Sequence, residues 1–342
     1  MSSPKTKRSP WFWIPSLYFA EGLPYVVVMT VSVIMYKRLG VSNTEIALYT
    51  SWLYLPWVIK PLWSPLVDIL KTKRHWIIAM QLLVGAGLAG VALTLPLDNF
   101  LRYSLAFLWL LAFSSATHDI AADGFYMLGL SQHKQAWFVG VRSTFYRLAM
   151  ITGQGLLVML AGYIEAVAGD LTRAWTVTFY VLAGLFVLFF LYHQWALPRP
   201  PADMPRSHNG IADIFREFGH TFLSFFKKQH IVPALAFLLL FRFAEAQLAK
   251  MASPFLLDAA EAGGLGLSTS QVGFVYGTVG VLMLTLGGIL GGVLAARHGL
   301  KFWLWWMVAA INLPNAVYIF LATVQPEAYW VINAAVGVEQ FG

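Results

Sequence analysis

The chain has 342 residues, of which 58% are hydrophobic and only 11% are charged. Soluble domains carry about 25% charged residues, so this composition excludes a soluble globular protein and indicates that most of the chain has no water to face. The formal charge of +7 does not indicate nucleic-acid binding, because the basic residues lie in short segments between long apolar runs.

Nine apolar runs are long enough to cross a bilayer as helices, which takes roughly 20 residues each. In chain order they cover 11–36, 45–66, 76–97, 103–130, 136–164, 174–196, 230–256, 269–296 and 302–323. The first run follows a basic N-terminus but is too long for a signal peptide, so we predict that it is retained as a helix. A tenth run begins near residue 328 and continues to Gly342.

A short phrase, Phe-Ala-Glu, occurs at 19–21 in the first run and again at 243–245 in the seventh. A duplicated helical bundle is typical of secondary transporters, whose substrate site lies between the two repeats. We therefore predict one six-helix bundle over 1–196 and a second bundle over 230–342. Because six and four spans are not equal halves, we expect the rest of the tenth span and two further spans beyond Gly342.

The segment 197–229 is predicted to be a cytoplasmic linker between the bundles. Four prolines lie near its start and break any helix there. From Ile211 to Phe226, apolar residues recur at helical spacing with basic residues beside them. This pattern is typical of an amphipathic helix that lies on a membrane surface.

The charges of the loops predict how the chain is oriented. If the N-terminus is cytoplasmic, 14 lysines and arginines fall in cytoplasmic segments and only four fall in the opposite loops. Cytoplasmic loops carry an excess of positive charge in membrane proteins. We therefore predict a multi-pass membrane protein with its N-terminus in the cytoplasm.

Charged residues inside membrane spans are costly, and each is a functional candidate. The fourth run holds Asp119 and Asp123, which are four residues apart and therefore share one face of a helix. Two close carboxylates in a medium of low dielectric constant cannot both ionise cheaply, which is the property that a proton carrier needs. In the alternative interpretation, the two acids pair with Arg142 or Arg147 on the next span and lock the bundle. Both interpretations can hold, because a carrier can exchange ion-pair partners during transport.

Other polar residues within the spans are predicted to bind substrate or to adjust the charges around it. Glu21 and Glu245 would lie at matching heights in the two bundles, where a central cavity is lined. Arg242 lies three residues before Glu245, a spacing that fits a local ion pair as well as ligand binding. The complete set of predicted substrate-binding residues is Glu21, His118, Arg142, Arg147, Arg242, Glu245 and Glu339.

His118 and Asp123 also match the pattern H-x-x-x-x-D, which some acyltransferases use. The pattern falls in the middle of a span, and no donor site is evident beside it. We therefore predict that the protein is not an enzyme, although a membrane enzyme or a sensor remains the alternative class. We predict neither a metal site nor a cofactor site.

The segments after the second and the eighth runs are similar to each other. In the first copy Asp68 precedes Lys73 and Arg74, and in the second copy Ala296 stands at the acidic position while Arg297 remains. An acid at a helix end can brace neighbouring helix N-termini while the cations stay at the lipid headgroups. We predict that Asp68, Lys73, Arg74 and Arg297 form a cytoplasmic gating loop.

The first of these copies resembles the G-x-x-x-D-R-x-G-R-R loop of the major facilitator superfamily, with Asp68 at the acidic position. Longer phrases resemble the AmpG-type muropeptide permeases and their relatives, the acetyl-coenzyme A transporters. They include the segments 19–24 and 60–68, the segment that ends at Asp123, and the segment 339–342. The resemblance covers nearly all of the chain. It implies an all-α integral membrane protein with two pseudo-symmetric six-helix bundles, of which the second is incomplete in this chain.

The resemblance also implies a function. Permeases of this type lie in the bacterial inner membrane and import N-acetylglucosaminyl-1,6-anhydro-N-acetylmuramyl peptides, released from peptidoglycan, with the proton gradient as the driving force. Asp119 or its neighbour Asp123 would then be the coupling residue. Within the same architecture, the alternative is another cargo, such as acetyl-coenzyme A, a drug or another metabolite. We expect a monomer whose partners are the muropeptide, protons and the lipid bilayer, and no nucleic acid.

Overall fold

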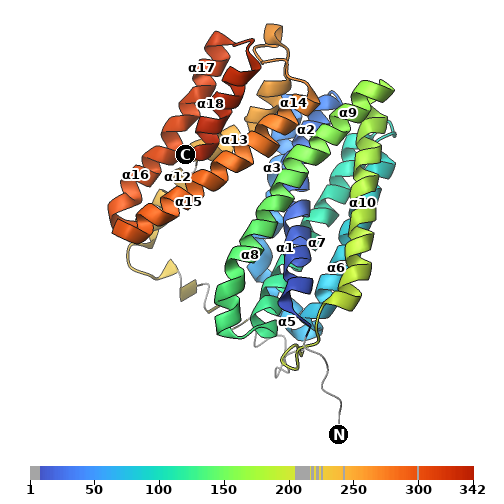
Figure 1. Cartoon of the computed structure of the whole chain (residues 1–342), viewed down its shortest axis with the longest axis vertical. Helices are drawn as coiled ribbons and strands as arrows, with labels where there is room; N and C mark the ends of the chain where they lie inside the picture. Colours follow the sequence, from blue (N-terminus) through green and yellow to red (C-terminus); the bar gives the residue numbers. More distant parts are fainter. Residues whose placement is uncertain are drawn as a thin grey trace. The chain divides into compact units, whose positions relative to one another are not determined.

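The computed structural model describes residues 8–204, 216, 219–220, 223–224, 226–241, 243–298 and 300–342. All regular secondary structure in these residues is helical. The chain divides into two compact units, Met1–Ser207 and His208–Gly342 (Figure 1). The predicted amphipathic helix lies mostly outside the described residues, and the predicted boundaries of the bundles and the linker remain predictions.

Eight helical stretches of the described residues are long and apolar enough to cross a membrane. They are Pro10–Arg38, Lys73–Thr94, Phe100–Gly129, Gln132–Ala168, Leu171–Ala196, Ile231–Leu257, Thr269–Gly291 and Lys301–Val324. Each corresponds to one of the nine spans predicted from the sequence. The remaining predicted span, 45–66, does not form one long helix.

Prolines break this second predicted span into short pieces. The pieces are α3 (Asn43–Ser51), a 3-10 turn (Trp52–Tyr54), α4 (Leu55–Ile59), a second 3-10 turn (Lys60–Leu62) and α5 (Ser64–Leu70). Pro56 lies in the first turn of α4, Pro61 lies in the second 3-10 turn, and Pro65 lies in the first turn of α5. Proline fits there because its missing N–H would be unpaired, but its ring prevents the preceding helix from continuing.

The first unit is built around one long helical stretch made of α1 (Ile14–Val26), a π-helical segment (Val27–Val31) and α2 (Ser32–Arg38). Pro24 lies inside α1, three residues before the π-helical segment begins. Both features are typical of sites where helices bend. They separate the part of the stretch that carries Glu21 from α2.

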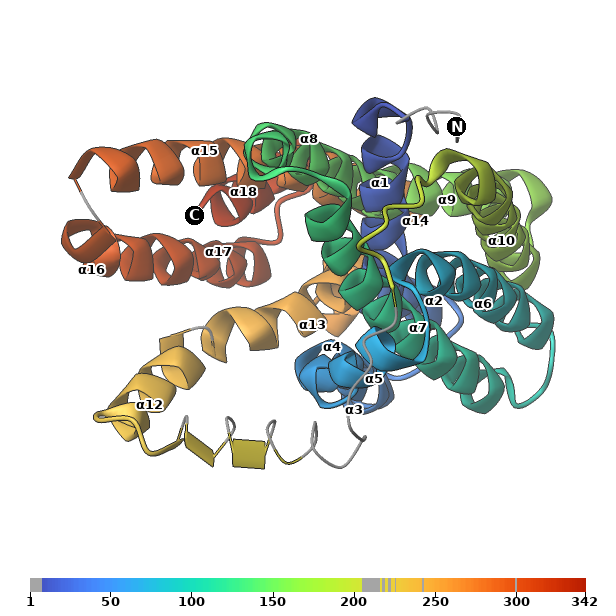
Figure 2. The same ribbon diagram turned by 90° about the horizontal axis from the view of Figure 1, so that it is seen from below.

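Five further helices complete the first unit around α1. They are α6 (Lys73–Thr94), α7 (Phe100–Gly129), α8 (Gln132–Ile151), α9 (Val158–Ala168) and α10 (Leu171–Ala196). Helix α8 packs along α1, α7 contacts both α1 and α6, and α10 covers α6 (Figures 1 and 2). Helix α1 therefore lies between α7 and α8, the two helices that carry the other residues of this unit predicted to couple protons or bind substrate.

Glycines allow α1 and its neighbours to approach closely. A Cβ atom added at Gly22 would lie 3.0 Å from the Cβ atom of Ala149 on α8. A Cβ atom at Gly153, in the π-helical segment Thr152–Leu157, would lie 2.1 Å from Cγ1 of Val26. Small residues permit this kind of close helix packing within membranes. The position of Glu21, next to Gly22, is therefore fixed against α8.

The second unit contains α12 (Ile231–Phe241), α13 (Phe243–Leu257), α14 (Thr269–Phe274), α15 (Val281–His298), α16 (Leu300–Asn312), α17 (Val317–Val324) and α18 (Tyr329–Phe341). A π-helical segment, Val275–Gly280, joins α14 to α15. Helix α18, the predicted tenth run, packs against α15 and α17.

Candidate functional site

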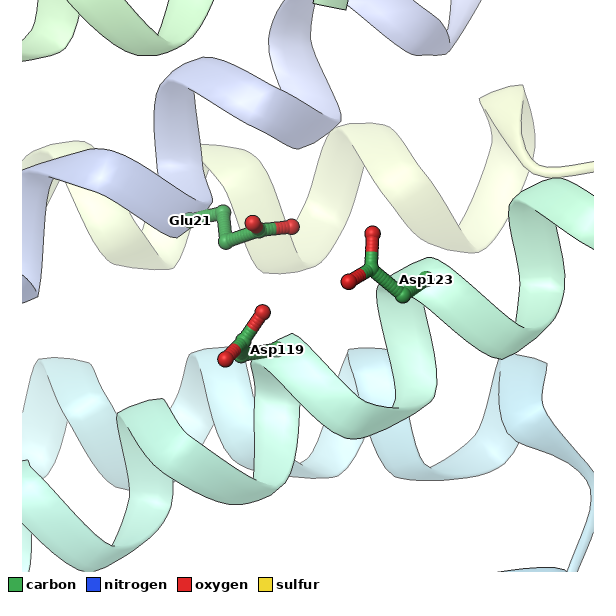
Figure 3. A group of neighbouring side chains, drawn as sticks. All are labelled: Glu21, Asp119 and Asp123. Atoms are coloured by element: carbon green, nitrogen blue, oxygen red, sulfur yellow. The ribbon is translucent and has the colours of Figure 1, made fainter. Parts of the chain in front are cut away.

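Three acidic side chains meet inside the first unit. Glu21 comes from α1, and Asp119 and Asp123 come from one face of α7 (Figure 3). Their carboxylate oxygens lie within 4.8 Å of one another. The spacing of four residues places the two aspartates on the same side of α7, as predicted from the sequence. We call these three residues the acidic cluster.

Two cations face the acidic cluster. Lys60 forms an ion pair with Asp119, and Arg142 forms an ion pair with Asp123 at 2.9 Å. Each aspartate therefore has a cationic partner. The ion pair between Asp123 and Arg142 is one of those predicted by the interpretation in which the acids lock the bundle. Oxygens this close could hold a metal ion, but two of the three carboxylates already face a cationic side chain.

Glu21 differs from the two aspartates. Its side chain forms no ion pair in the described part of the chain, and only 7% of the residue is exposed. Its Oε2 atom is buried and has no hydrogen-bond partner among the described residues. A buried carboxylate without a cation or a donor is unfavourable because nothing replaces its lost hydration. The acidic cluster therefore contains one group whose charge is not balanced locally.

Aromatic rings hold Arg142 in place. Its guanidinium lies over the ring of Tyr18 at 4.5 Å and over the ring of Tyr126 at 5.2 Å. The hydroxyl of Tyr18 also donates a hydrogen bond to Asp123 Oδ1 at 3.2 Å. Because a planar guanidinium can stack on rings and bind a carboxylate at once, Arg142 is a positioned cation.

A cavity of about 280 Å³ opens beside the acidic cluster. It is lined by Glu21, Tyr25, Tyr54, Trp57, Lys60, Asp119 and Tyr146. The ring of Tyr25 meets that of Trp57 edge to face at 5.2 Å, so the aromatic wall is continuous. Ligand sites typically combine such apolar and aromatic walls with a few convergent polar groups.

The broken second span supplies much of this wall. Tyr54, Trp57 and Lys60 are three residues apart along it, and all three line the cavity. None of the three was predicted from the sequence as a site residue. A lysine within an apolar run was a usable signal for Lys60. Tyrosine and tryptophan are common at membrane interfaces, so nothing in the sequence marked these aromatic residues as cavity-lining.

His118 does not reach the cavity, although it precedes Asp119 in sequence. It is buried in a chain of hydrogen bonds that links α7, α6, α10 and α1. Gln81 Nε2 donates to His118 Nε2 at 3.1 Å, and His193 Nδ1 donates to Gln81 Oε1 at 3.0 Å. Ser16 donates to His193 Nε2 at 2.9 Å. These bonds connect four helices and leave His118 on a different side of α7 from the acidic cluster.

The remaining predicted substrate-binding residues are dispersed. Arg147 is half-buried on α8 and does not line the cavity. Glu245 on α13 and Glu339 on α18 belong to the second unit, where their charges interact with each other. Gln340 donates a hydrogen bond to Glu339 at 2.8 Å. Arg242 lies outside the described residues, so the predicted ion pair with Glu245 stays a prediction.

The predicted gating loop contains an ion pair between Asp68 and Lys73. Lys73 is buried, and its side chain packs against α7 at Gly124. In the second unit, Arg297 is exposed near the end of α15. That the cations of this loop stay at the lipid headgroups remains a prediction.

Asp203, and not Asp68, braces the helix N-terminus beside this loop. Its carboxylate accepts hydrogen bonds from the backbone N–H of Lys73 at 2.7 Å and of Arg74 at 3.0 Å. The Arg74 guanidinium donates to the carbonyl oxygens of Gln194 and Leu197. Carboxylates stabilise helix N-termini in this way. The beginning of α6 is thus tied to the end of α10.

Comparisons with known proteins place the chain in a family. The sequence model described as Major Facilitator Superfamily matches residues 16–341. The Rickettsia conorii protein AmpG 4, described as a transporter, is 26% identical over 96% of this chain and 78% of its own length. The anhydromuropeptide permease of Escherichia coli strain K12 is 26% identical over 83% of this chain and 55% of its own length. The match thus spans about half the length of that permease.

Solved transporters share the fold. A bacterial homologue of the human lysosomal transporter Spinster, in an inward-facing and unoccupied conformation, gives a TM-score of 0.64 at 17% identity over 99% of this chain and 74% of its own. A variant of the nucleoside transporter NupG gives a TM-score of 0.65 at 13% identity over 96% of this chain and 79% of its own. The predicted all-α architecture is therefore confirmed. This chain belongs to the major facilitator superfamily and is a multi-pass membrane transporter, not an enzyme.

Proposed function

We propose that this protein is a proton-coupled transporter that imports anhydromuropeptides across the bacterial inner membrane, with its N-terminus in the cytoplasm. The observation that carries the proposal is the cavity of the first unit, where aromatic rings and partly buried charges surround one space. The similarity to the Escherichia coli anhydromuropeptide permease supports the cargo, and the bacterial relatives support the location.

The chemistry of the cavity suits a sugar ring. Tyr25, Tyr54, Trp57 and Tyr146 offer apolar ring faces together with polar edges. The ammonium of Lys60 can donate to hydroxyl or acetamido oxygens, and the acids can accept from hydroxyl groups. At about 280 Å³ the cavity lies at the lower end of the range of small-molecule sites, about 300–1,000 Å³, which supports one sugar ring of the cargo as its occupant. The peptide part would bind elsewhere, with Arg147 and Arg242 as the proposed partners of its carboxylates.

In the proposed mechanism, Asp119 and Asp123 carry or sense the transported proton. Both aspartates hold cations in the structure, Lys60 and Arg142. A proton that enters the acidic cluster weakens the attraction between the carboxylates and these cationic side chains, and a cationic side chain so released can donate to a hydroxyl or acetamido oxygen of the cargo. Alternating exposure of the site to the two sides of the membrane would then move the cargo and the proton together.

The test is uptake of labelled anhydromuropeptide into proteoliposomes with an imposed proton gradient. We expect Asp119→Asn and Asp123→Asn each to abolish gradient-driven accumulation. Glu165→Gln is the matched control, because Glu165 also forms an ion pair within a span of the first unit, with Arg38, but does not line the cavity. Undiminished, gradient-driven uptake in both aspartate variants would reject their coupling role.

The same assay tests the alternative cargoes. We expect unlabelled anhydromuropeptide to compete with the labelled cargo, and acetyl-coenzyme A or a cationic drug to compete weakly or not at all. Strong competition by acetyl-coenzyme A together with no uptake of muropeptide would assign this transporter a different cargo.

A further inference from the structure

The charges of the acidic cluster and its cations do not balance. Asp119 is paired with Lys60, and Asp123 is paired with Arg142, so two cations serve three carboxylates. If all three acids ionise, one negative charge remains, and it falls on Glu21, which has no ion-pair partner among the described residues. A single proton on the cluster would make it neutral.

Glu21 also has one carboxylate oxygen without a hydrogen-bond partner among the described residues. Only 7% of Glu21 is exposed, and the oxygen without a partner in the described part of the chain is Oε2. Figure 3 shows this carboxylate directed toward the two aspartates of α7. Protonation of such an unpartnered, buried oxygen improves its contacts, because a protonated carboxyl can donate a hydrogen bond to a neighbouring carboxylate.

We propose that Glu21 is the residue that binds and releases the transported proton, whereas Asp119 and Asp123 hold the cations and sense the proton through Glu21. This inference rests on the proposed proton-coupled transport and names the proton-binding residue of that same site. Protonation of either aspartate would leave Lys60 or Arg142 without its anion. Protonation of Glu21 leaves no cation unpaired.

The titratable and charged groups on the helices packed against Glu21 support this assignment. The titratable or charged side chains that face the site are Tyr18 and Tyr25 of α1, Tyr54 and Lys60 of the broken second span, Asp119 and Asp123 of α7, and Arg142 and Tyr146 of α8. Helix α10 contributes His193, which contacts α1 at Ser16 instead. The two cations in this set already pair with the aspartates, so the set holds one more carboxylate than it has cations.

The assignment gives an order to transport. With Glu21 ionised, the excess negative charge of the cluster repels an anionic cargo from the cavity that Glu21, Lys60 and Asp119 line. With Glu21 protonated, the repulsion is removed, and the new O–H can donate to an aspartate and loosen that aspartate's hold on its cation. The proton therefore binds before the cargo.

The first experiment compares accumulation with exchange in proteoliposomes. With one proton per cargo, an imposed gradient of about one pH unit supports about tenfold accumulation, because one unit is a tenfold ratio of proton activity. We expect Glu21→Gln to accumulate no cargo above the external concentration but to retain exchange of labelled for unlabelled cargo at equal pH. Asp119→Asn should lose both accumulation and exchange, because it also leaves Lys60 without its anionic partner. Glu165→Gln should match the unaltered protein.

The second experiment needs no cargo. Infrared difference spectra of the purified protein, recorded between alkaline and acidic pH, should contain the carbonyl band of one carboxyl group that takes up a proton. We expect this band to disappear in Glu21→Gln and to persist in Glu165→Gln. If Glu21→Gln does not fold, Glu21→Asp replaces it, and the band and the pH profile of exchange should shift.

These outcomes separate the two proposals. Gradient-driven accumulation and an unchanged carbonyl band in Glu21→Gln, or an unchanged band and pH profile in Glu21→Asp, would overturn the role of Glu21 while leaving proton coupling intact. Absence of muropeptide uptake by the unaltered protein would refute the proposed cargo, and the infrared band would still decide whether Glu21 binds the proton.

Discussion

At the scale of single residues, Lys60 is the side chain on which the acidic cluster and the cavity both depend. It pairs with Asp119 and also lines the cavity, and 34% of its side chain is exposed. Its ammonium is therefore within reach of a ligand while it holds an acid of the cluster. A side chain with both contacts can respond to either partner, so the pair should behave as a coupled unit.

A double-mutant cycle tests this coupling. We expect Lys60→Met to lower the stability of the purified protein by about 1–2 kcal/mol, a value between those of exposed and buried ion pairs, because Asp119 would be left without its cation. Adding Asp119→Asn should recover part of that loss. The readout is the thermal unfolding midpoint in detergent. Strictly additive effects of the two substitutions would show that the pair is not coupled.

At the scale of helices, the contact between α1 and the π-helical segment after α8 sets the position of Glu21. Gly153 has no room for a Cβ atom, since that atom would lie 2.1 Å from Cγ1 of Val26 and 3.3 Å from its Cβ. Valine is stiff about χ1 in a helix, so Val26 cannot simply turn away. Any larger residue at this position must push α1 aside, and with it the segment that carries Glu21.

We therefore expect Gly153→Ala to destabilise the protein by about 1–3 kcal/mol through overpacking. Gly184→Ala on α10 is the matched control, because nothing lies within 4 Å of a Cβ atom there. That substitution should be neutral or stabilising by up to about 1 kcal/mol, since alanine favours helix more than glycine does. Thermal unfolding of both variants provides the comparison. Equal midpoints for the two would contradict the close approach of α1 and this segment.

The helices also show which features the sequence could predict. The shared face of Asp119 and Asp123 follows from their spacing alone, and it was predicted correctly. His118 was grouped with them because it is adjacent in sequence, yet a helix turns about 100° per residue, so neighbours point in different directions. The position of Glu21 beside α7 depends on how α1 is rotated and packed, which a single sequence does not contain.

Two other features were not predicted from the sequence, for different reasons. The prolines at 56, 61 and 65 are visible in the sequence, but apolar length alone suggested one continuous helix, and the break that brings Lys60 to the cavity was missed. Asp203 caps a helix that begins 130 residues earlier in the chain. A contact of that separation leaves no local pattern, so only the fold reveals it.

At the scale of the whole molecule, membership in the major facilitator superfamily makes α7 a membrane-crossing helix, and the loop charges predict its direction. Asp98 lies just before this helix and Lys134 lies just after it, in the first turn of α8, and both residues are exposed. The excess of lysine and arginine predicts that Lys134 lies in the cytoplasm and Asp98 outside. The proposed inward transport along the proton gradient requires this orientation to be uniform among the molecules of a membrane.

Cysteine labelling tests the orientation directly, because the chain has no cysteine of its own. We expect a membrane-impermeant maleimide to label Asp98→Cys in intact cells and Lys134→Cys only in inverted vesicles. Both positions are exposed and lie outside the cavity, so neither substitution should change uptake. The reverse pattern would invert the proposed topology and make the N-terminus external. Labelling of both positions from one side would show that α7 does not cross the membrane, and the acidic cluster on α7 could then not carry a proton from one side to the other.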